Sequence, residues 1–189
     1  MSAQDSKLFV ISGPSGAGKG TLVTRVRERH SNLGLTVSAT TRAPRKGEVD
    51  GVNYFFLTRE EFDRRVANGE FVEWAEVHGN CYGTLVSEVQ SKLASGSSLI
   101  LEIDVQGALQ VKERFPEAVL IFIKPPSLEV LRERLVGRGT ETPETIELRM
   151  ANAAHELALA DRYDDVVVND DLDRATDELV RVLDMHERI

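Results

Sequence analysis

The chain has 189 residues, enough for one α/β domain with small inserted segments and too few for two full domains. Its net charge is −8, from 23 basic and 31 acidic residues, which argues against a general nucleic-acid or anionic-membrane partner. Cys81 is the single cysteine, so no internal disulfide can form. Because no apolar run is long enough for a bilayer span or a signal peptide, we expect a cytoplasmic protein.

The first predicted elements are a buried strand and a helix, joined by a glycine-rich turn. Residues 7–12 form the apolar run of the strand, and residues 19–30 place Leu22, Val23 and Val26 on one helical face. Residues 35–38 are expected to form a second strand. The stretch 41–51 that follows has loop chemistry with concentrated positive charge.

Short elements come next. Residues 54–57 predict a strand, and Thr58 begins a helix with Glu61 three residues later, which is a capping-box pattern. Two strands around a turn and a short helix ending at Gly96 are expected after it, over 71–77, 81–84 and 87–94. Because these hairpin-like pieces interrupt the strand–helix rhythm, we interpret 38–95 as an insertion over one edge of a sheet.

The remaining chain alternates between strands and helices. Strands are predicted over 98–103, 119–123 and 165–168, and helices over 105–115, from Ser127 to Gly137, from Pro143 to about residue 160 and from about Asp173. This alternation predicts an α/β fold with a central, mostly parallel sheet between layers of helices. Ligands in such folds bind at the carboxyl ends of the strands.

The strongest single motif is Gly-Pro-Ser-Gly-Ala-Gly-Lys-Gly-Thr over residues 13–21. It follows the first predicted strand and opens the first predicted helix, which is the context of a P-loop. In a P-loop, backbone N–H groups and the helix N-terminus surround nucleotide phosphates, and Lys19 is the residue expected to reach the β and γ phosphates. The core is therefore expected to be a three-layer P-loop core.

The motif departs from the usual pattern at one position. A serine or threonine normally follows the lysine and binds Mg²⁺, but this chain has Gly20 there and Thr21 next. One residue along a helix turns a side chain by about a quarter turn. Either Thr21 binds the metal directly, or Mg²⁺ keeps most of its waters and is held mainly by the phosphates.

Further segments, in the same order over nearly the whole chain, resemble guanylate kinases. They are Ser38–Glu48 with Gly51 and Tyr54, Phe71–Ala75, Gly79–Thr84, Leu101–Gly107, Gly137–Thr142 and Val168–Asp171. The resemblance implies a kinase of purine nucleotide metabolism that transfers a phosphoryl group from ATP to GMP, and to dGMP, with Mg²⁺. It also implies one domain, 1–189, with a core (1–37, 96–136 and 151–189), a GMP-binding insertion (38–95) and a lid (137–150). Both a monomer and a homo-oligomer are compatible with the sequence.

The resemblance also assigns the site residues. ATP is expected at Gly13, Pro14, Ser15, Gly16, Ala17, Gly18, Lys19, Gly20, Thr21 and Asn169. GMP is expected at Ser38, Arg42, Arg45, Tyr54, Glu73, Tyr82, Thr84, Glu102 and Asp104. The catalytic set is Lys19, Arg42, Arg138 and Arg149, with Arg132 and Arg134 as nearby alternatives. Thr21 and Asp104 are the expected metal contacts, directly or through water, and Glu102 is expected to contact the base or substrate.

The chemistry of these residues agrees with a GMP site. Arg42 and Arg45 can each fork onto phosphate oxygens, and the two tyrosines can add hydroxyl donors. Guanine differs from adenine by its N1–H and its exocyclic amine, which are both donors, so a carboxylate is the apt partner. Glu73 is the prime candidate, with Glu102 or Asp104 in support.

Two other functions stay open. The Gly20-Thr21 pair is similar to that of adenylate kinases, which suggests another nucleoside monophosphate kinase, although Glu73, Ser38 and Tyr82 argue against it. Some scaffold proteins carry a guanylate-kinase-like module that has lost catalysis and binds partner peptides. Such modules typically have degraded P-loops, whereas Lys19 is intact in this chain.

Overall fold

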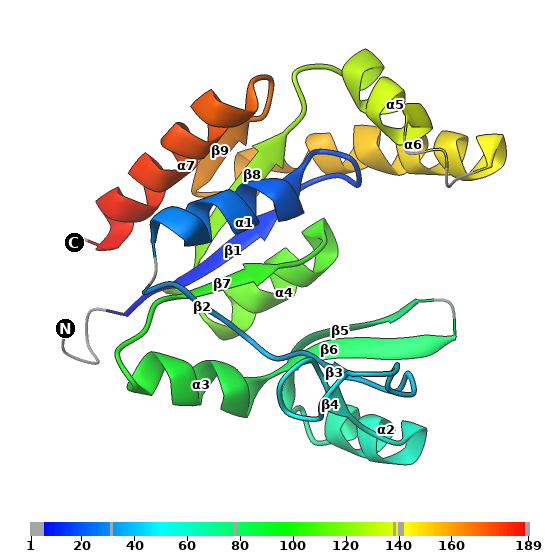
Figure 1. Cartoon of the computed structure of the whole chain (residues 1–189), viewed down its shortest axis with the longest axis vertical. Coiled ribbons are helices and arrows are strands. Elements are labelled where there is room, and N and C mark those ends of the chain that lie inside the picture. Colours follow the sequence, from blue (N-terminus) through cyan, green and yellow to red (C-terminus); the bar gives the residue numbers. More distant parts are fainter. Residues whose placement is uncertain (1–5, 31, 78, 138, 140–141, 188–189) are drawn as a thin grey trace.

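The computed structural model describes residues 6–30, 32–77, 79–137, 139 and 142–187, and its α/β fold confirms the expected class. Within these residues, a five-stranded parallel sheet with the order β2-β7-β1-β8-β9 forms the core (Figure 1). Its strands are β1 (Leu8–Ser12), β2 (Gly34–Leu35), β7 (Leu99–Glu102), β8 (Val119–Lys124) and β9 (Asp165–Val168).

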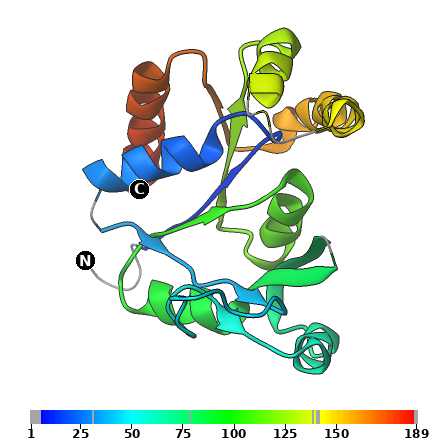
Figure 2. The ribbon, with the colours of Figure 1, turned by 45° about the vertical axis from the view of Figure 1, so that its right-hand side comes forward.

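Helices cover both faces of this sheet (Figure 2). Phe9 and Ile11 pack on the face covered by α1 (Lys19–Arg29) and α7 (Leu172–Glu187). Leu8 and Val10 pack on the opposite face, against α4 (Val105–Arg114). Because successive side chains of a strand point to opposite faces, a strand buried on both faces shows a continuous apolar run, as residues 8–11 of β1 do before the buried Ser12.

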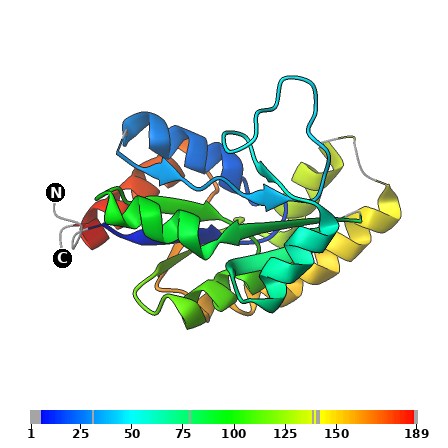
Figure 3. The ribbon, with the colours of Figure 1, turned by 90° about the horizontal axis from the view of Figure 1, so that it is seen from below.

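A second, four-stranded sheet lies within residues 39–85 of the described chain, in the order β4-β3-β6-β5. Its strands are β3 (Ala39–Thr40), β4 (Phe55–Phe56), β5 (Phe71–Val77) and β6 (Asn80–Leu85). Helix α2 (Arg59–Ala67) lies between β4 and β5 in the chain, and α3 (Val86–Ala94) follows β6. The second sheet has a small core of its own, in which the Phe62 and Phe71 rings stack with centroids 4.3 Å apart. The segment between β3 and β4 projects as a loop, drawn in cyan in Figure 3.

The predicted helix starts are confirmed by their caps. The Thr58 hydroxyl accepts the Glu61 N–H at 3.1 Å, and Thr142 caps α6 (Pro143–Leu157) with the proline in its first turn. Helix α5 (Leu128–Gly137) packs on α6 through a small apolar cluster. In the part of the chain that the structure describes, no helix combines the length and apolarity that crossing a membrane requires.

Some element boundaries differ from the expectation. The strand expected over 35–38 is shorter and ends at Leu35, because the chain then leaves the sheet and the Val37 N–H donates to the Glu88 carboxylate at 3.0 Å. Strand β3 was not predicted, since two residues are too few to show a period. The helix expected to reach residue 160 ends at Leu157, and a 3₁₀ turn over Ala160–Arg162 follows it.

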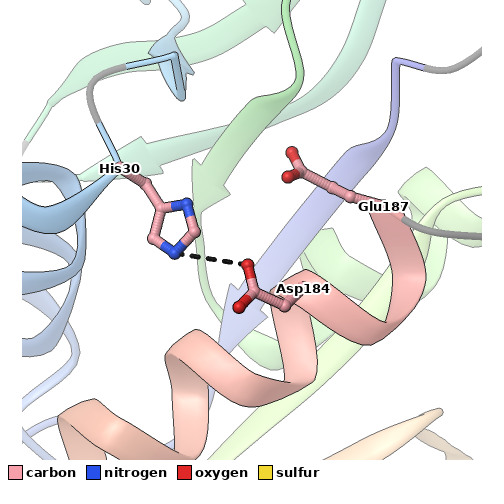
Figure 4. Close-up of side chains that lie close together, drawn as sticks. All are labelled: His30, Asp184 and Glu187. Atoms are coloured by element: carbon pink, nitrogen blue, oxygen red, sulfur yellow. Dashed lines mark ion pairs between the residues drawn. The ribbon is translucent and has the colours of Figure 1, made fainter.

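Polar contacts join α1 to α7 along their length. Two ion pairs link the helices, Arg25–Asp173 and Arg29–Asp177. Near the ends of the two helices, His30 Nε2 lies 3.5 Å from Asp184 Oδ1, with Glu187 beside them (Figure 4). The side-chain nitrogen and oxygen atoms of these three residues that could bind a metal ion lie within 4.8 Å of one another. They are at the end of α1 opposite to the glycine-rich turn, so they belong to the helix packing and not to the site described next.

Candidate functional site

The glycine-rich turn connects β1 to α1 in a conformation that favours glycine at several positions, including Gly13 and Gly18. Gly13 has φ +142° and Gly18 has φ +92°. A Cβ atom on Gly13 would lie 2.3 Å from the carbonyl oxygen of Ile123, and one on Gly18 would lie 2.3 Å from Nδ2 of Asn169. The turn is therefore held tightly against the sheet, and the N-terminus of α1 faces the space that it encloses.

Lys19, the first residue of α1, extends over this turn. Its ammonium donates to the carbonyl oxygens of Gly13 at 2.5 Å and Pro14 at 3.1 Å. The lysine charge is thus placed at the rim of the turn.

Two residues from distant elements support the turn from outside. The side-chain amide of Asn169, which follows β9 and is buried, donates to the Ala17 carbonyl at 2.7 Å. The Arg134 guanidinium of α5 donates to the carbonyls of Asn169 at 2.8 Å and of Ala17 at 3.5 Å. Asn169 and Arg134 also line a hollow beside the turn with Gly16, Gly18 and Thr21. Asn169, expected to contact ATP, thus has a structural hydrogen bond to the turn as well.

The lid-region arginines separate into different roles. Arg149 of α6 donates to the hydroxyl of Ser15, so α6 brings a guanidinium to the glycine-rich turn. Arg132 instead forms an ion pair with Glu147 on the surface. Arg138, which was expected to be catalytic, lies outside the described residues.

The two carboxylates near the end of β7 face different surroundings. Glu102 lines the hollow of the turn together with Lys19, Gly20 and Thr21. A Cβ on Gly20 would lie 3.4 Å from Glu102 Oε1, so the carboxylate is directly beside the position where most P-loops have a hydroxyl. Burial raises the pKa of the Glu102 carboxyl, and the nearby Lys19 ammonium opposes that shift.

Asp104 is not in that hollow. Its carboxylate caps α4 by accepting the Gly107 N–H at 2.7 Å, and it lies close to Glu73 of the second sheet. From the sequence, Asp104 was expected to contact the metal and to support Glu73 in the GMP site, and Glu102 was expected to contact the base or substrate. The structure places Glu102 beside the turn and Asp104 toward Glu73.

Glu73 is oriented by its neighbour across the β5–β6 pair. The Thr84 hydroxyl donates to Glu73 Oε1 at 2.8 Å, and Thr84 is almost fully buried. Burial raises the pKa of the Glu73 carboxyl; the Thr84 hydrogen bond opposes this shift and the charge of Asp104 adds to it. The β5–β6 register shifts between Phe71 and Glu73, a β-bulge of the kind that re-aims side chains next to active sites.

The aromatic and basic residues expected to bind a phosphate gather at the loop after β3. The Arg42 guanidinium lies 5.3 Å from the centroid of the Tyr54 ring, and the Tyr54 and Tyr82 rings are 6.2 Å apart. A hydrogen bond to Glu48 raises the pKa of Arg42, and that same bond lowers the pKa of Glu48. The side chain of Arg45 is exposed on the same loop.

Glu48 is a residue whose role the sequence reasoning missed. Its two oxygens accept from both terminal nitrogens of Arg42, at 2.9 and 3.0 Å, and Oε2 also accepts the Arg45 backbone N–H at 2.6 Å. The available signal was an acidic residue three positions after Arg45 within a basic loop. Glu48 therefore fixes the direction in which the Arg42 guanidinium points.

A second hollow lies between the two sheets. It is lined by residues of the core and of the second sheet, including Gly20, Ser38, Tyr54, Thr84 and Glu102. Gly20 and Glu102 also line the hollow of the glycine-rich turn, so the two hollows adjoin at these residues.

The fold and the glycine-rich turn define a P-loop nucleotide-binding protein. Comparison with known proteins makes this specific, because the family model for guanylate kinase matches residues 5–186. The chain is 57% identical to a guanylate kinase of Gloeobacter violaceus over 94% of this chain and 87% of that one. It is 52% identical to a guanylate kinase of Halalkalibacterium halodurans, covering 97% and 90% of the two chains. The crystal structure of guanylate kinase from Anaplasma phagocytophilum superimposes with a TM-score of 0.72 at 37% identity, covering 96% of this chain and 86% of that chain. The chain belongs to the guanylate kinase family, and it is a kinase.

Proposed function

We propose that this protein transfers the γ-phosphoryl group of ATP to GMP, forming ADP and GDP. The observation that carries the proposal is the junction of the two hollows at Gly20 and Glu102. A nucleotide with its phosphates in the glycine-rich turn would face a nucleotide in the second hollow across this junction. The reaction belongs to purine nucleotide metabolism, and we place it in the cytoplasm, with dGMP as a second acceptor.

In this proposal ATP occupies the glycine-rich turn. Backbone N–H groups from Gly13 to Thr21 bind its phosphates, and Lys19 moves from the turn carbonyls onto the β and γ groups. Asn169 holds the turn in place and lines the hollow beside it. Arg149, which donates to the Ser15 hydroxyl, is proposed to stabilise charge on the transferred group.

GMP occupies the second hollow. Arg42, Arg45, Tyr54 and Tyr82 are the proposed phosphate ligands, since a guanidinium held by Glu48 is pre-oriented for bidentate binding. Four further residues are the proposed base ligands. Glu73 accepts from the guanine N1–H and amine, Asp104 supports it, and the hydroxyls of Ser38 and Thr84 complete the set.

The residues around the junction fit a hydrated divalent cation. Glu102 supplies a carboxylate and Thr21 a hydroxyl to the same hollow as Lys19, and oxygen donors of this kind are those that Mg²⁺ prefers. When bound, Mg²⁺ would neutralise charge on the phosphate oxygens. We therefore propose Glu102 and Thr21 as the metal contacts, directly or through water, and Asp104 as a base contact.

Catalysis in this scheme is positioning plus electrostatics. The GMP phosphate is already largely ionised near neutral pH, so no general base is needed. The insertion (38–95) and the lid (137–150) are proposed to close over the substrates and exclude water, which would otherwise accept the phosphoryl group. Arg138 in the lid is proposed to join Arg42 and Arg149 around the transferred group at closure.

The acceptor specificity tests this proposal. ADP formation from ATP and Mg²⁺ would be measured with GMP, dGMP, AMP, CMP or UMP as the acceptor. Rapid turnover with the guanine nucleotides only is the expected result. A preference for AMP would show that another monophosphate is the substrate, and no turnover with any acceptor would favour a binding module.

A further inference from the structure

Helix α4 connects the core to the second sheet at both of its ends. Its buried residues Val105, Ala108 and Val111 belong to the same apolar cluster as Val72 of β5, so the helix packs directly on that strand. In Figure 1, α4 lies between the core sheet and the β5–β6 pair. Helix α4 therefore fixes the position of β5 relative to the core sheet.

The C-terminal end of α4 holds the start of β5. The guanidinium of Arg114, the last residue of the helix, donates to the carbonyl oxygen of Phe71 and, at 2.7 Å, to that of Gly69. These carbonyls immediately precede the bulge between Phe71 and Glu73. One planar guanidinium thus holds two backbone groups just before the strand is re-aimed.

The N-terminal end of α4 lies against Glu73. A Cβ on Gly107 would lie 3.6 Å from the Glu73 Cβ and 3.4 Å from Asp104 Oδ1. Asp104 is itself fixed there as the N-cap of α4. The helix therefore holds Asp104 at one end and, through Arg114, the segment that carries Glu73 at the other.

We propose that Arg114 is a positioning residue for guanine recognition, which holds Glu73 at the place where it and Asp104 can read the base together. This inference rests on the proposed function of Glu73. The Arg114 side chain is exposed, and its two hydrogen bonds are made to backbone carbonyls in the neighbouring segment. Its loss should therefore change the stability of the protein little while it displaces the carboxylate.

The expected effect is confined to GMP. Arg114→Ala should raise the KM for GMP by about 5- to 30-fold, the scale of a small displacement of a substrate contact, and leave the KM for ATP within about twofold. The KM for GMP of Arg114→Lys should lie between those of the wild type and Arg114→Ala, because an ammonium keeps the charge but cannot donate to two carbonyls in the way that a guanidinium does. Arg181→Ala, an exposed arginine of α7 on the other face of the core, is the matched control and should change neither constant.

A double-mutant cycle with Glu73→Gln decides the proposal. If Arg114 acts through Glu73, the Arg114→Ala change should lose most of its effect on the KM for GMP in the Glu73→Gln background. Additive effects, an unchanged KM for GMP, or equal losses for ATP and GMP would overturn the role of Arg114. If Glu73→Gln alone leaves GMP use unchanged, the proposed role of Glu73 has failed, and the role of Arg114 fails with it. Melting temperatures of all variants would be measured in parallel, and a loss of stability without a change in the KM for GMP would also overturn it.

Discussion

The Thr84 hydroxyl donates a 2.8 Å hydrogen bond to Glu73 Oε1 across the β5–β6 pair. The bond orients a carboxylate that burial has made harder to ionise and that lies close to a second acid, Asp104. Such a pair of acceptors suits a base with two adjacent donors, which is how guanine differs from adenine.

Replacement of Glu73 by glutamine tests whether this carboxylate accepts hydrogen bonds from guanine. The amide oxygen can still accept from Thr84, but the amide is a poorer acceptor for the guanine donors. Glu73→Gln should lower kcat/KM for GMP by about 10- to 100-fold, the cost of losing charge-assisted hydrogen bonds in a buried site. Steady-state kinetics with each substrate varied in turn would measure it. Equal losses for ATP and GMP would contradict the assignment.

The raised pKa of Glu73 predicts a pH dependence of opposite sign for binding and for stability. Guanine binding needs the carboxylate, so the KM for GMP should rise as the pH falls through the raised folded-state pKa. The folded protein holds this proton more tightly than the unfolded chain, so ionised Glu73 destabilises the fold at neutral pH. At neutral pH, Glu73→Gln should therefore have a higher melting temperature than the wild type, and the difference between the two should narrow as the pH falls. A melting temperature below the wild-type value would contradict this sign.

Lys19 can be removed without removing a packing residue. Lys19→Ala should lower kcat by about 10²- to 10³-fold, because a charge that stabilises the transferred group is lost, while the melting temperature stays close to that of the wild type. Lys7→Ala, at the other end of β1, is the matched control. Retained turnover in a folded Lys19→Ala protein would exclude the proposed role.

The loss of Arg42 should mainly raise the KM for GMP and should change the KM for ATP much less. Arg42→Ala should raise the KM for GMP by about 10- to 100-fold, since it removes a pre-oriented bidentate ligand of the phosphate. Glu48→Ala should act in the same direction with a smaller effect, because both terminal nitrogens of Arg42 bond to Glu48. An unchanged KM for GMP in Arg42→Ala would remove this residue from the site.

The assignment of Glu102, the last residue of β7, and of Asp104, the N-cap of α4, is tested by metal titration. Glu102→Gln should raise the Mg²⁺ concentration needed for half-maximal rate by about 10- to 100-fold. Asp104→Asn should leave that concentration nearly unchanged and raise the KM for GMP. The reverse pattern would restore the assignment made from the sequence.

The fold was predictable because its elements carry local signals. The continuous apolar run in β1 predicts a buried strand, and the cap at Thr58 predicts the start of a helix, each from only a few residues. Strand β3 carries no such signal, because Ala39 and Thr40 become a strand only by pairing with β4 and β6. The boundaries of short strands therefore depend on contacts that are distant in the sequence.

The sequence named the candidate site residues, but it did not predict how they are arranged. Glu102 and Asp104 are two residues apart, a spacing that puts side chains on one face within a strand. The strand ends at Glu102, however, and Asp104 already has the conformation of a helix N-cap, so the two carboxylates diverge. The pairing of Glu48 with Arg42 likewise depends on how a loop folds back, which no spacing rule gives.

The most direct test of the account follows the phosphoryl group itself. The protein would be incubated with ATP labelled at the γ-phosphate, Mg²⁺ and GMP, and the labelled products would be separated. The proposed reaction should place the label in the β-phosphate of GDP, with little labelled inorganic phosphate and no comparable transfer when AMP replaces GMP. Label released mainly as inorganic phosphate, or transferred to AMP as readily as to GMP, would contradict it.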